Sequence, residues 1–356
     1  MSLKIEQITD VANSTFESRQ FNVINDAATT LQSFVAGERL LDKGRLVFGG
    51  GDVFKYPIIY RGDTNAAAVG PFEPGELDQR DGTTEGTVGY KILRTGCHHD
   101  ITQLSANAGK NRIYSFLAAK EYQMWIGLWE MIEEYFWFGP SSSSDDKVPY
   151  GMLGYWLDYS GSTGFNGGNH TNWSSGPGGI DCSSAAGTNY QHRTFNYTDI
   201  TDADGLEKTK DSIELCDFKG IPNKPIKDAS PGAPDHEIYT THDNLKDFRS
   251  LLENKNESIG LDLGRYMNST IIKGVPVTWV PYLQNNHDTS DPIIGVNWND
   301  FRAVTPDGGM WNQRIPYSRA ANQPTVFEMW ILYELNFVMQ NRRSHFLGAK
   351  SDPLSD

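Results

Sequence analysis

The sequence predicts an α+β protein, and three segments of unusual length support that assignment. A helical pattern covers 110–138, an alternating pattern covers 327–339, and two shorter alternating runs predict a hairpin within 49–95. The long helix and the long terminal strand would each span on the order of 40 Å. Because the two lengths match, we expect both to belong to one elongated domain.

Residues 1–48 predict an N-terminal arm. Apolar positions from Ile24 to Val35 follow helical spacing, and Gly37 is expected to end this pattern. We therefore expect one short helix within the arm.

Two alternating runs, Val53–Tyr60 and Thr87–Arg94, predict the strands of the hairpin. The connection between them, 61–86, is rich in Gly, Asp and Pro and is far longer than a tight turn. Connections longer than about 12–15 residues are usually functional or disordered. We therefore expect the hairpin to extend toward another surface.

A single long helix is predicted from Lys110 to Phe138, where Gly139-Pro140 ends it. One face is expected to pack and the opposite face to remain in solvent. The packed face carries Ile113, Leu117, Met124, Leu128, Met131 and Tyr135, and the solvent face carries Arg112, Gln123, Glu130 and Glu134. A helix of this length would serve as the structural backbone of its domain.

The middle of the chain predicts loops followed by two helices. Residues 141–197 are rich in Gly, Ser and Asn and predict long loops with short strands. Helices are predicted over Leu206–Phe218 and Asp243–Asn254, with a proline-rich connector, Pro222–Pro234, between them.

The C-terminal third turns to strands. Val275–Trp279 alternates around Pro276, and Ile293–Phe301 gives another extended run. Pro276 and Pro281 indicate edge strands or strand ends. The clearest alternation comes last, because apolar residues occupy every odd position from Phe327 to Met339.

The composition excludes several classes of protein. The 356 residues carry 45 acidic and 31 basic side chains, a formal net charge of −14. This balance argues against a sequence-reading DNA binder, which needs clustered Lys and Arg. No secretion signal is visible, and three glutamates interrupt the most apolar window, 122–138, so we expect a soluble protein with no membrane segment. The odd count of cysteines, Cys97, Cys182 and Cys216, predicts free thiols.

No catalytic signature is present, whether a G-x-S-x-G elbow, a phosphate loop, a dinucleotide fingerprint or an H-E-x-x-H helix. Cys97-His98-His99 is the best metal candidate by residue type, but adjacent side chains on an extended chain point to opposite faces. Glu133 and Glu134 suit a solvated helix face better than a glycosidase pair. We therefore expect no catalytic, cofactor-binding or metal-binding residues.

Three further motifs have a functional and a structural interpretation. The aromatic, Gly- and Asn-rich stretch Phe165–Trp173 could line a carbohydrate groove or form a buried turn cluster. Arg61-Gly62-Asp63 spells an adhesion tripeptide, which is usually a chance match. A basic cluster after the terminal strand could contact phosphate, or could be a solvated strand end or a salt bridge between subunits. It consists of Arg342, Arg343, His345 and Lys350.

The order of these elements resembles that of the major capsid proteins of tailed bacteriophages. Specific segments strengthen the resemblance, which covers about four fifths of the chain. They are Met124-Trp125, Glu134–Gly139, Gly151–Trp156, Gly164–Asn169, Ile272–Val277, Pro292–Trp298 and Leu335–Arg343.

The resemblance implies a non-enzymatic shell subunit that assembles as hexamers and pentamers into an icosahedral shell around double-stranded DNA. It also implies five parts. These are an N-terminal arm (1–48), an extended loop hairpin (49–95), a peripheral domain with the spine helix and the Gly/Asn-rich loops (96–200), an axial domain (201–322), and a terminal long strand that returns to the peripheral domain (323–356).

The resemblance also implies partners and a location. We expect further copies of the chain, a portal, a separate scaffolding protein, with decoration proteins as an option, and no cofactor. The scaffolding protein is expected to be separate because only about 45 residues precede the hairpin. An acidic inner wall would make only weak, non-specific contact with packaged DNA. The protein would reside in a virion that is assembled in the host bacterial cytoplasm.

The sequence does not assign a covalent cross-link between subunits. Lys55 and Lys91 lie in or near the extended loop, and some relatives join subunits through a Lys to Asn bond. Nothing in the sequence identifies a partner Asn or a catalytic carboxylate for either lysine.

Two alternatives remain open. An encapsulin-like compartment would share the fold and would contain an enzyme instead of DNA. A carbohydrate-binding protein or glycoside hydrolase would use the stretch Phe165–Trp173 and would be a monomer or a small oligomer. Cargo and oligomeric state discriminate among the three.

Overall fold

The computed structural model describes most of the chain, and the statements below concern only the described residues. These are residues 31, 33–42, 46–62, 68–71, 82–100, 102, 116–184, 187–216, 235–255, 270–307, 313–320, 323 and 325–355. The chain divides into two compact units, and each is described by itself. Unit 1 comprises Met1–Gln32, Ile92–Ile132 and Met310–Glu334, and unit 2 comprises Ser33–Lys91, Glu133–Gly309 and Leu335–Asp356.

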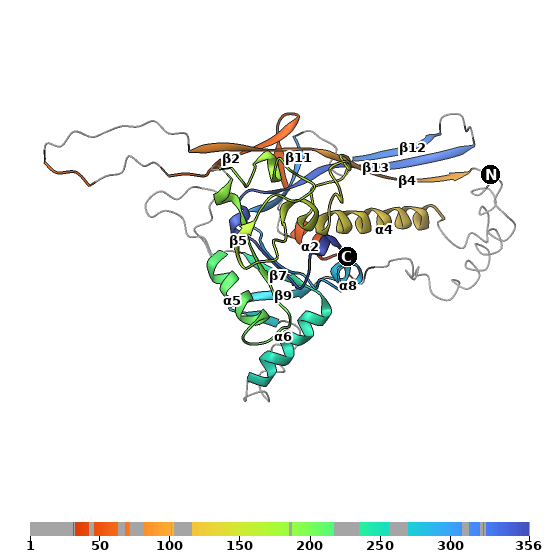
Figure 1. Ribbon diagram of the computed structural model, residues 1–356. Coiled ribbons are helices and arrows are strands. Elements are labelled where there is room, and N and C mark those ends of the chain that lie inside the picture. The colour runs from red at the N-terminus through yellow and green to blue at the C-terminus, as the bar shows by residue number, and fades with distance from the viewer. Residues whose placement is uncertain are drawn as a thin grey trace. The chain divides into compact units, whose positions relative to one another are not determined.

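Helices and strands are interspersed along the chain (Figure 1). The α-helices are α2 (Val35–Asp42), α4 (Phe116–Trp137), α5 (Gly205–Cys216), α6 (His242–Lys255) and α8 (Pro281–Asn286). The short helical turns are η2 (Met152–Trp156), η3 (Pro177–Gly179), η4 (Thr188–Tyr190), η5 (Arg342–Ser344) and η6 (Pro353–Ser355). The strands are β1 (Leu46–Gly49), β2 (Val53–Ile59), β3 (Thr83–Gly89), β4 (Lys91–Asp100), β5 (Gly164–Gly167), β6 (His192–Asn196), β7 (His236–Thr240), β8 (Thr270–Ile272), β9 (Val275–Trp279), β10 (Ile293–Asn297), β11 (Phe301–Pro306), β12 (Gln313–Arg319), β13 (Val326–Met339) and β14 (Phe346–Ala349).

A seven-stranded mixed sheet forms the centre of unit 2, in the order β5-β6-β14-β10-β7-β9-β8. β7 is antiparallel to β10 and parallel to β9, whereas β14 is antiparallel to β10 and parallel to β6. Every residue of β7, β10 and β14 is buried. Because successive side chains of a strand point to opposite faces, both faces of the sheet are covered there.

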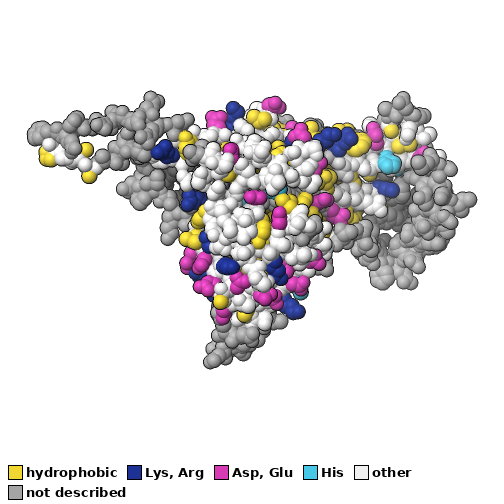
Figure 2. Space-filling view, in the orientation of Figure 1, with side chains coloured by type: hydrophobic (Ala, Val, Ile, Leu, Met, Phe, Trp, Pro, Cys, Tyr) yellow, Lys and Arg dark blue, Asp and Glu magenta, His cyan; other side chains and the backbone are white. Residues whose placement is uncertain are grey.

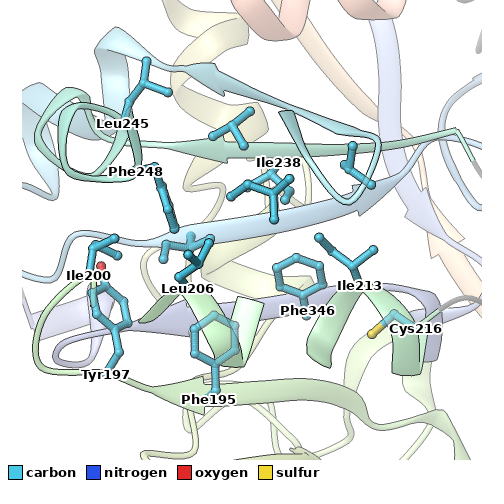
Figure 3. Close-up of a cluster of buried hydrophobic side chains, with 14 residues drawn as sticks. Phe195, Tyr197, Ile200, Leu206, Ile213, Cys216, Ile238, Leu245, Phe248 and Phe346 are labelled. Carbon is cyan, nitrogen blue, oxygen red and sulfur yellow. The ribbon is translucent and has the colours of Figure 1, made fainter. Parts of the chain in front are cut away.

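α5 and α6 supply apolar side chains to one face of this sheet. Figure 3 shows side chains from both helices and from the strands meeting in one buried cluster. Full burial of each large apolar side chain stabilises the fold by about 1.5–3 kcal/mol. The cluster consists of Phe195, Tyr197, Ile200, Leu206, Ile213, Cys216, Ile238, Leu245, Phe248, Ile272, Val275, Val277, Ile293 and Phe346.

The opposite face carries an aromatic cluster that holds the end of α4. Tyr239, next to a core residue on β7, has its ring centroid 5.0 Å from that of Trp137. Phe136 packs edge-on against Phe301 and Phe337, with centroids 5.3 Å apart in both pairs. Such pairs add about 0.5–1.5 kcal/mol each beyond the area that they bury.

A second sheet has the order β1-β11-β13-β12, with β4 also paired to β13. In unit 2, β1 is parallel to β11, and β11 is antiparallel to the end of β13. In unit 1, β12 is antiparallel to the beginning of β13. β13 is 14 residues long, and its odd positions from Met329 to Met339 are buried. The long terminal strand is therefore confirmed.

α4 confirms the predicted long helix over its described part, and Gly139, with φ of +71°, follows its end. Residues 110–115 lie outside the described residues. The packed face differs from the prediction, because Met131 and Tyr135 are only half-buried. The buried apolar positions of its described side chains are Met124, Leu128, Ile132 and Phe136, at every fourth residue, and Trp137.

The second predicted strand of the hairpin is divided into two strands, which is a correction to the sequence analysis. β3 ends at Gly89 and β4 begins at Lys91. The alternation changes phase at this break, so Val88 is buried and Ile92 is 55% exposed, although the pattern predicts one face for both. The cause is a change of partner, because β3 pairs with β2 and β4 pairs with β13.

The short N-terminal helix is also corrected. The predicted segment Ile24 to Val35 lies largely outside the described residues, and α2 begins at Val35, where the prediction ends. Gly37 lies inside α2 and does not end it. The start of α2 is set by a remote side chain, described below.

The remaining predictions hold with adjusted boundaries. α5 and α6 confirm the two predicted helices over their described residues, whereas the connector 222–234 lies outside them. The run Ile293–Phe301 is divided by a turn into β10 and the start of β11. β9 lies between β7 and β8, and Pro276 precedes the first residue that pairs with β7, so the strand-end interpretation is correct.

All three cysteines are free and buried, as predicted. Among the helices that the structure describes, none combines the length and the apolar character needed to cross a membrane.

Candidate functional site: an anchored hairpin

β2 and β3 form an antiparallel hairpin with an unbroken register. Val53 lies opposite Gly89 at one end, and Ile59 lies opposite Thr83 at the other. Burial alternates along both strands, with the more buried residues at even positions. The hairpin therefore has a packed inner face and an exposed outer face.

The outer face of the hairpin is exposed and partly apolar. Ile59 is 64% exposed and Val53 is 38% exposed. Among the described strands, β2 and β3 pair only with each other. A two-stranded hairpin is at best marginally stable alone, and open strand edges readily pair with another chain. This surface is suited to lie against a second protein chain.

Tyr56 anchors the inner face and is 2% exposed. Its ring lies across Gly86, the residue directly opposite on β3, where any Cβ would overlap the ring. Its hydroxyl lies beside Gly178 of η3 and 3.0 Å from the hydroxyl of Tyr190. Tyr190 donates a hydrogen bond of 2.7 Å to the carbonyl of Met339, which ties the hairpin to β13.

Two amide side chains hold the ends of the hairpin. Asn189 Nδ2 donates to the carbonyl of Tyr60 at 2.9 Å, and Asn336 Nδ2 donates to the carbonyl of Gly89 at 2.6 Å. Asn336 also accepts the N–H of Tyr150 at 2.7 Å. Between these ends, Tyr56 and Val88 are the buried side chains of the inner face.

Arg342 is fully buried and connects the Gly- and Asn-rich loops. Its guanidinium donates to the carbonyls of Trp156 and Gly168 at 2.8 and 3.1 Å. It also lies 2.9 Å from Nδ1 of His192 and 3.0 Å from Sγ of Cys182. A guanidinium has five donors in one plane, so one side chain can hold several loops together.

The basic cluster is not one exposed patch, because Arg342 and His345 are buried, Arg343 is half-buried and Lys350 is exposed, so the solvated strand end is corrected for the two buried residues. Arg342 and His345 are 0% exposed. Lys350 pairs with Asp291 of the same chain at 2.6 Å. The chain after β13 passes into the core of unit 2, which its charged composition does not indicate.

The aromatic, Gly- and Asn-rich stretch forms a partly buried turn cluster, in which Gly167 and His170 are buried and Thr171 and Asn172 are exposed. Trp173 Nε1 donates to the carbonyl of Gly154 at 3.2 Å, and its ring packs edge-on against Tyr155 with centroids 5.0 Å apart. The side chain of Asn169 bonds to the loop at 181–182. These polar groups are engaged within the chain instead of being directed toward a ligand.

Glu133 is buried and holds the start of α2, contrary to the solvated position predicted for it. Its carboxylate accepts the N–H groups of Ala36 at 3.0 Å and Gly37 at 3.3 Å, and Trp137 Nε1 at 2.7 Å. Burial raises the pKa of this carboxyl group, and the hydrogen bonds oppose that shift. A carboxylate is also stabilised by the partial positive charge of a helix N-terminus. Glu134 is exposed, so the two glutamates do not form a catalytic pair.

In unit 1, the Cys97-His98-His99 motif alternates as predicted, with His98 exposed and its two neighbours buried. His99 stacks on Phe327 with ring centroids 5.8 Å apart, and burial lowers the pKa of its imidazole. Over the described ranges, no group of three or more His, Cys, Asp or Glu side chains is arranged to hold a metal ion.

The lysines of the extended loop form surface ion pairs. Lys55 lies 3.6 Å from Glu85 across the hairpin, and Lys91 lies 2.7 Å from Asp146. Exposed pairs of this kind typically contribute about 0–1 kcal/mol.

The adhesion tripeptide is only partly described. Arg61 and Gly62 are exposed at the end of β2, and Asp63 lies outside the described residues. Nothing in the described part assigns a role to it.

Sequence reasoning did not predict the anchoring role of Tyr56, the loop-joining role of Arg342 or the capping role of Glu133. The pattern places Tyr56 on one face of its strand, but the pairing with Gly86 that makes room for its ring depends on a register set in three dimensions. Arg342 stands out in the sequence only as part of a basic cluster, and its burial could not be predicted because its acceptors come from loops far away along the chain.

Comparison with known proteins finds similar folds among solved structures. No family model matches the sequence, and no curated protein matches it. Solved structures do match: the capsid asymmetric unit of cyanophage A-1(L) has a TM-score of 0.60 at 12% identity and covers 91% of this chain and 94% of that one. The capsid of the native GTA particle has a TM-score of 0.51 at 10% identity, covering 95% and 98%. The mature capsid of bacteriophage PhiM1 has a TM-score of 0.50 at 7% identity, covering 92% and 89%.

The chain is thus an α+β protein with a capsid fold. In particular, it has the fold of the tailed-bacteriophage major capsid proteins, which confirms the fold that the sequence resemblance implies.

Proposed function

We propose that the protein is the major capsid protein of a tailed bacteriophage and assembles as hexamers and pentamers into an icosahedral shell around double-stranded DNA. The fold that it shares with phage capsid structures supports this proposal. The observation that carries it is the hairpin, whose strands pair only with each other among the described strands and whose outer residues Val53 and Ile59 are exposed. A monomer leaves that surface in water, whereas a shell can bury it against neighbouring subunits.

The role proposed is structural and non-enzymatic. The buried acidic and basic groups that chemistry would need are engaged in packing, since Glu133 caps α2 and Arg342 joins loops. The five-part division supports the same role, and we propose it in full. Its parts are the N-terminal arm 1–48, the extended loop hairpin 49–95, the peripheral domain 96–200, the axial domain 201–322 and the terminal strand 323–356.

Contact with the packaged genome is proposed to be weak and non-specific. The net charge is −14, and Figure 2 shows acidic and basic side chains interspersed over the part of unit 2 that contains α5 and α6. A surface of mixed sign releases few counterions from DNA and binds it weakly. Packing would then depend on a portal, and assembly on a separate scaffolding protein in the host bacterial cytoplasm, before the protein resides in the virion.

The test is electron microscopy with size-exclusion chromatography of the purified chain, with and without its neighbouring phage gene products. Closed shells or rings of five and six subunits are expected, and shells formed in infected cells should protect DNA from nuclease. Shells that contain an enzyme instead of DNA would favour an encapsulin-like compartment. A stable monomer with glycan affinity would overturn the proposal in favour of a carbohydrate-binding protein.

A further inference from the structure

We infer that Tyr56 is a positioning residue that fixes the direction of the β2-β3 hairpin within the free subunit, before any neighbour contacts it. The consequence for a shell rests on the proposed function. The anchor itself rests only on contacts within unit 2.

Two hydrogen bonds run in one direction, from Tyr56 on the hairpin through Tyr190 to β13. Tyr190 has one hydroxyl hydrogen, and it donates that hydrogen to the carbonyl of Met339 at 2.7 Å. Tyr56 must therefore donate in the bond of 3.0 Å between the two hydroxyls. The chain of bonds starts on the hairpin and ends on the backbone of β13. Burial raises the pKa of the Tyr56 hydroxyl, so the donor keeps its hydrogen at neutral pH.

The Tyr56 side chain also fits closely against two glycines. The Tyr56 ring occupies the space that a side chain would need at Gly86, its partner in the opposite strand. The hydroxyl occupies the corresponding space at Gly178, where φ is +68° and a side chain would also strain the backbone. Two glycines from separate segments thus leave one closely fitting position for the ring, and the fit sets the angle between hairpin and body.

The pairing of β2 with β3 does not depend on the anchor. β2 and β3 are joined by a continuous backbone register that does not involve the Tyr56 side chain. The bonds from Asn189 and Asn336 hold only the ends of the hairpin. Loss of the Tyr56 ring should therefore leave the hairpin paired but allow it to change direction about its ends.

The direction of the hairpin matters in a shell because its outer residues must meet the same surface on every neighbour. A hairpin that points in one direction loses less conformational freedom when it docks than one that samples many. Tyr56 would thereby favour regular assembly without contacting a neighbour itself.

The experiment measures a distance distribution in the unassembled subunit by electron spin resonance. Spin labels are attached at I59C, at the exposed end of β2, and at D247C, on the exposed side of α6. The natural cysteines are buried, so the labels react at the introduced sites. The pair is measured in the otherwise unchanged chain and with Tyr56→Ala, Tyr56→Phe or Lys55→Ala, the last being an exposed neighbour that serves as the matched control.

We expect a narrow distribution in the parent and in Lys55→Ala, loss of the narrow peak in Tyr56→Ala, and a smaller broadening in Tyr56→Phe, which keeps the ring and removes only the hydroxyl. If Tyr56→Ala unfolds the rest of unit 2, the distance distribution of Tyr56→Phe alone tests whether Tyr56 fixes the direction of the hairpin. An unchanged narrow peak in both variants would overturn the anchor. Broad peaks together with normal yields of regular shells would overturn its role in assembly. Failure of the parent chain to form shells would count against the proposed function, and the distance measurement would still decide whether the anchor exists.

Discussion

Two sheets of unit 2 have opposite relations to solvent. Every residue of β7 in the seven-stranded sheet is buried, whereas in β2 only the inner face contacts the body. α5 and α6 cover one face of the large sheet and aromatic side chains cover the other, but the hairpin has a single covered face, and among the described strands β2 and β3 pair only with each other. The large sheet is therefore stabilised on both faces within the chain, whereas the hairpin is covered on one face only. This contrast predicts that equivalent substitutions act on subunit stability in one sheet and on assembly in the other.

The largest loss of stability is expected in the apolar cluster where α6 covers the large sheet. Phe248 is 0% exposed within the apolar cluster, and Phe248→Ala should lower the free energy of unfolding of the subunit by about 3–5 kcal/mol, because it leaves a cavity. Urea denaturation of unassembled subunits measures this change. Phe48→Ala is the matched control, because Phe48 is 58% exposed, and its effect should stay within about 0.5 kcal/mol. Equal losses in the two variants would contradict the comparison.

The next largest effect is expected at Glu133, where α2 joins the body. Glu133→Gln keeps the shape but replaces one accepting oxygen by an NH2 group, so at least one of the buried donors from α2 or Trp137 loses its acceptor. The expected loss is about 2–4 kcal/mol, with faster hydrogen exchange in residues 33–42. The control is Glu134→Gln, an exposed neighbour on the same helix. If the two variants behaved alike, Glu133 would not hold α2.

The sequence predicts the elements of both sheets better than it predicts their surroundings. The terminal strand and the helices α4, α5 and α6 follow from periodicity, because burial on one face imposes a pattern along the chain. The division of β3 from β4 at Tyr90 does not follow, since it results from a change of partner strand. Burial of Glu133 and Arg342 is also invisible, because their partners are remote in sequence. For the candidate site, the hairpin is predictable and its anchor is not.

At Asp158 we expect a smaller change in the free energy of unfolding, and here the substitution should stabilise the subunit. Burial raises the pKa of this carboxyl group to about 6 although the charge of Arg342 opposes the shift, and Asp352 raises it further. Since the folded state binds the proton more tightly than the unfolded state, ionised Asp158 destabilises the fold increasingly as the pH rises from about 4 to above 6. Asp158→Asn should therefore add about 1–3 kcal/mol of stability at pH 7 and nothing at pH 4.

Urea denaturation of Asp158→Asn and of the parent chain at both pH values tests this prediction. Burial also lowers the pKa of His192 and His345, which destabilises the fold below the usual imidazole range. Those histidines are present in both proteins, so the difference between the two curves isolates Asp158. A gain that was the same at both pH values would show that charge is not its cause.

The smallest change in the free energy of unfolding is expected on the outer face of the hairpin. A substitution there should affect assembly and leave subunit stability almost unchanged. Ile59→Thr keeps a β-branched side chain, so the free energy of unfolding should change by no more than about 0.5 kcal/mol. It replaces part of an apolar side chain that is 64% exposed by a hydroxyl, so a neighbouring subunit that covers this position would bury an unpaired polar group. Sedimentation should then show fewer subunits in shells, whereas Lys55→Thr, on the same exposed face, should lose less because its charge is already paired at the surface with Glu85. Normal shell yields from Ile59→Thr would mean that no neighbour packs on this face, and the stability of the hairpin would then have to come from its contacts within the subunit, those of Tyr56, Asn189 and Asn336 included.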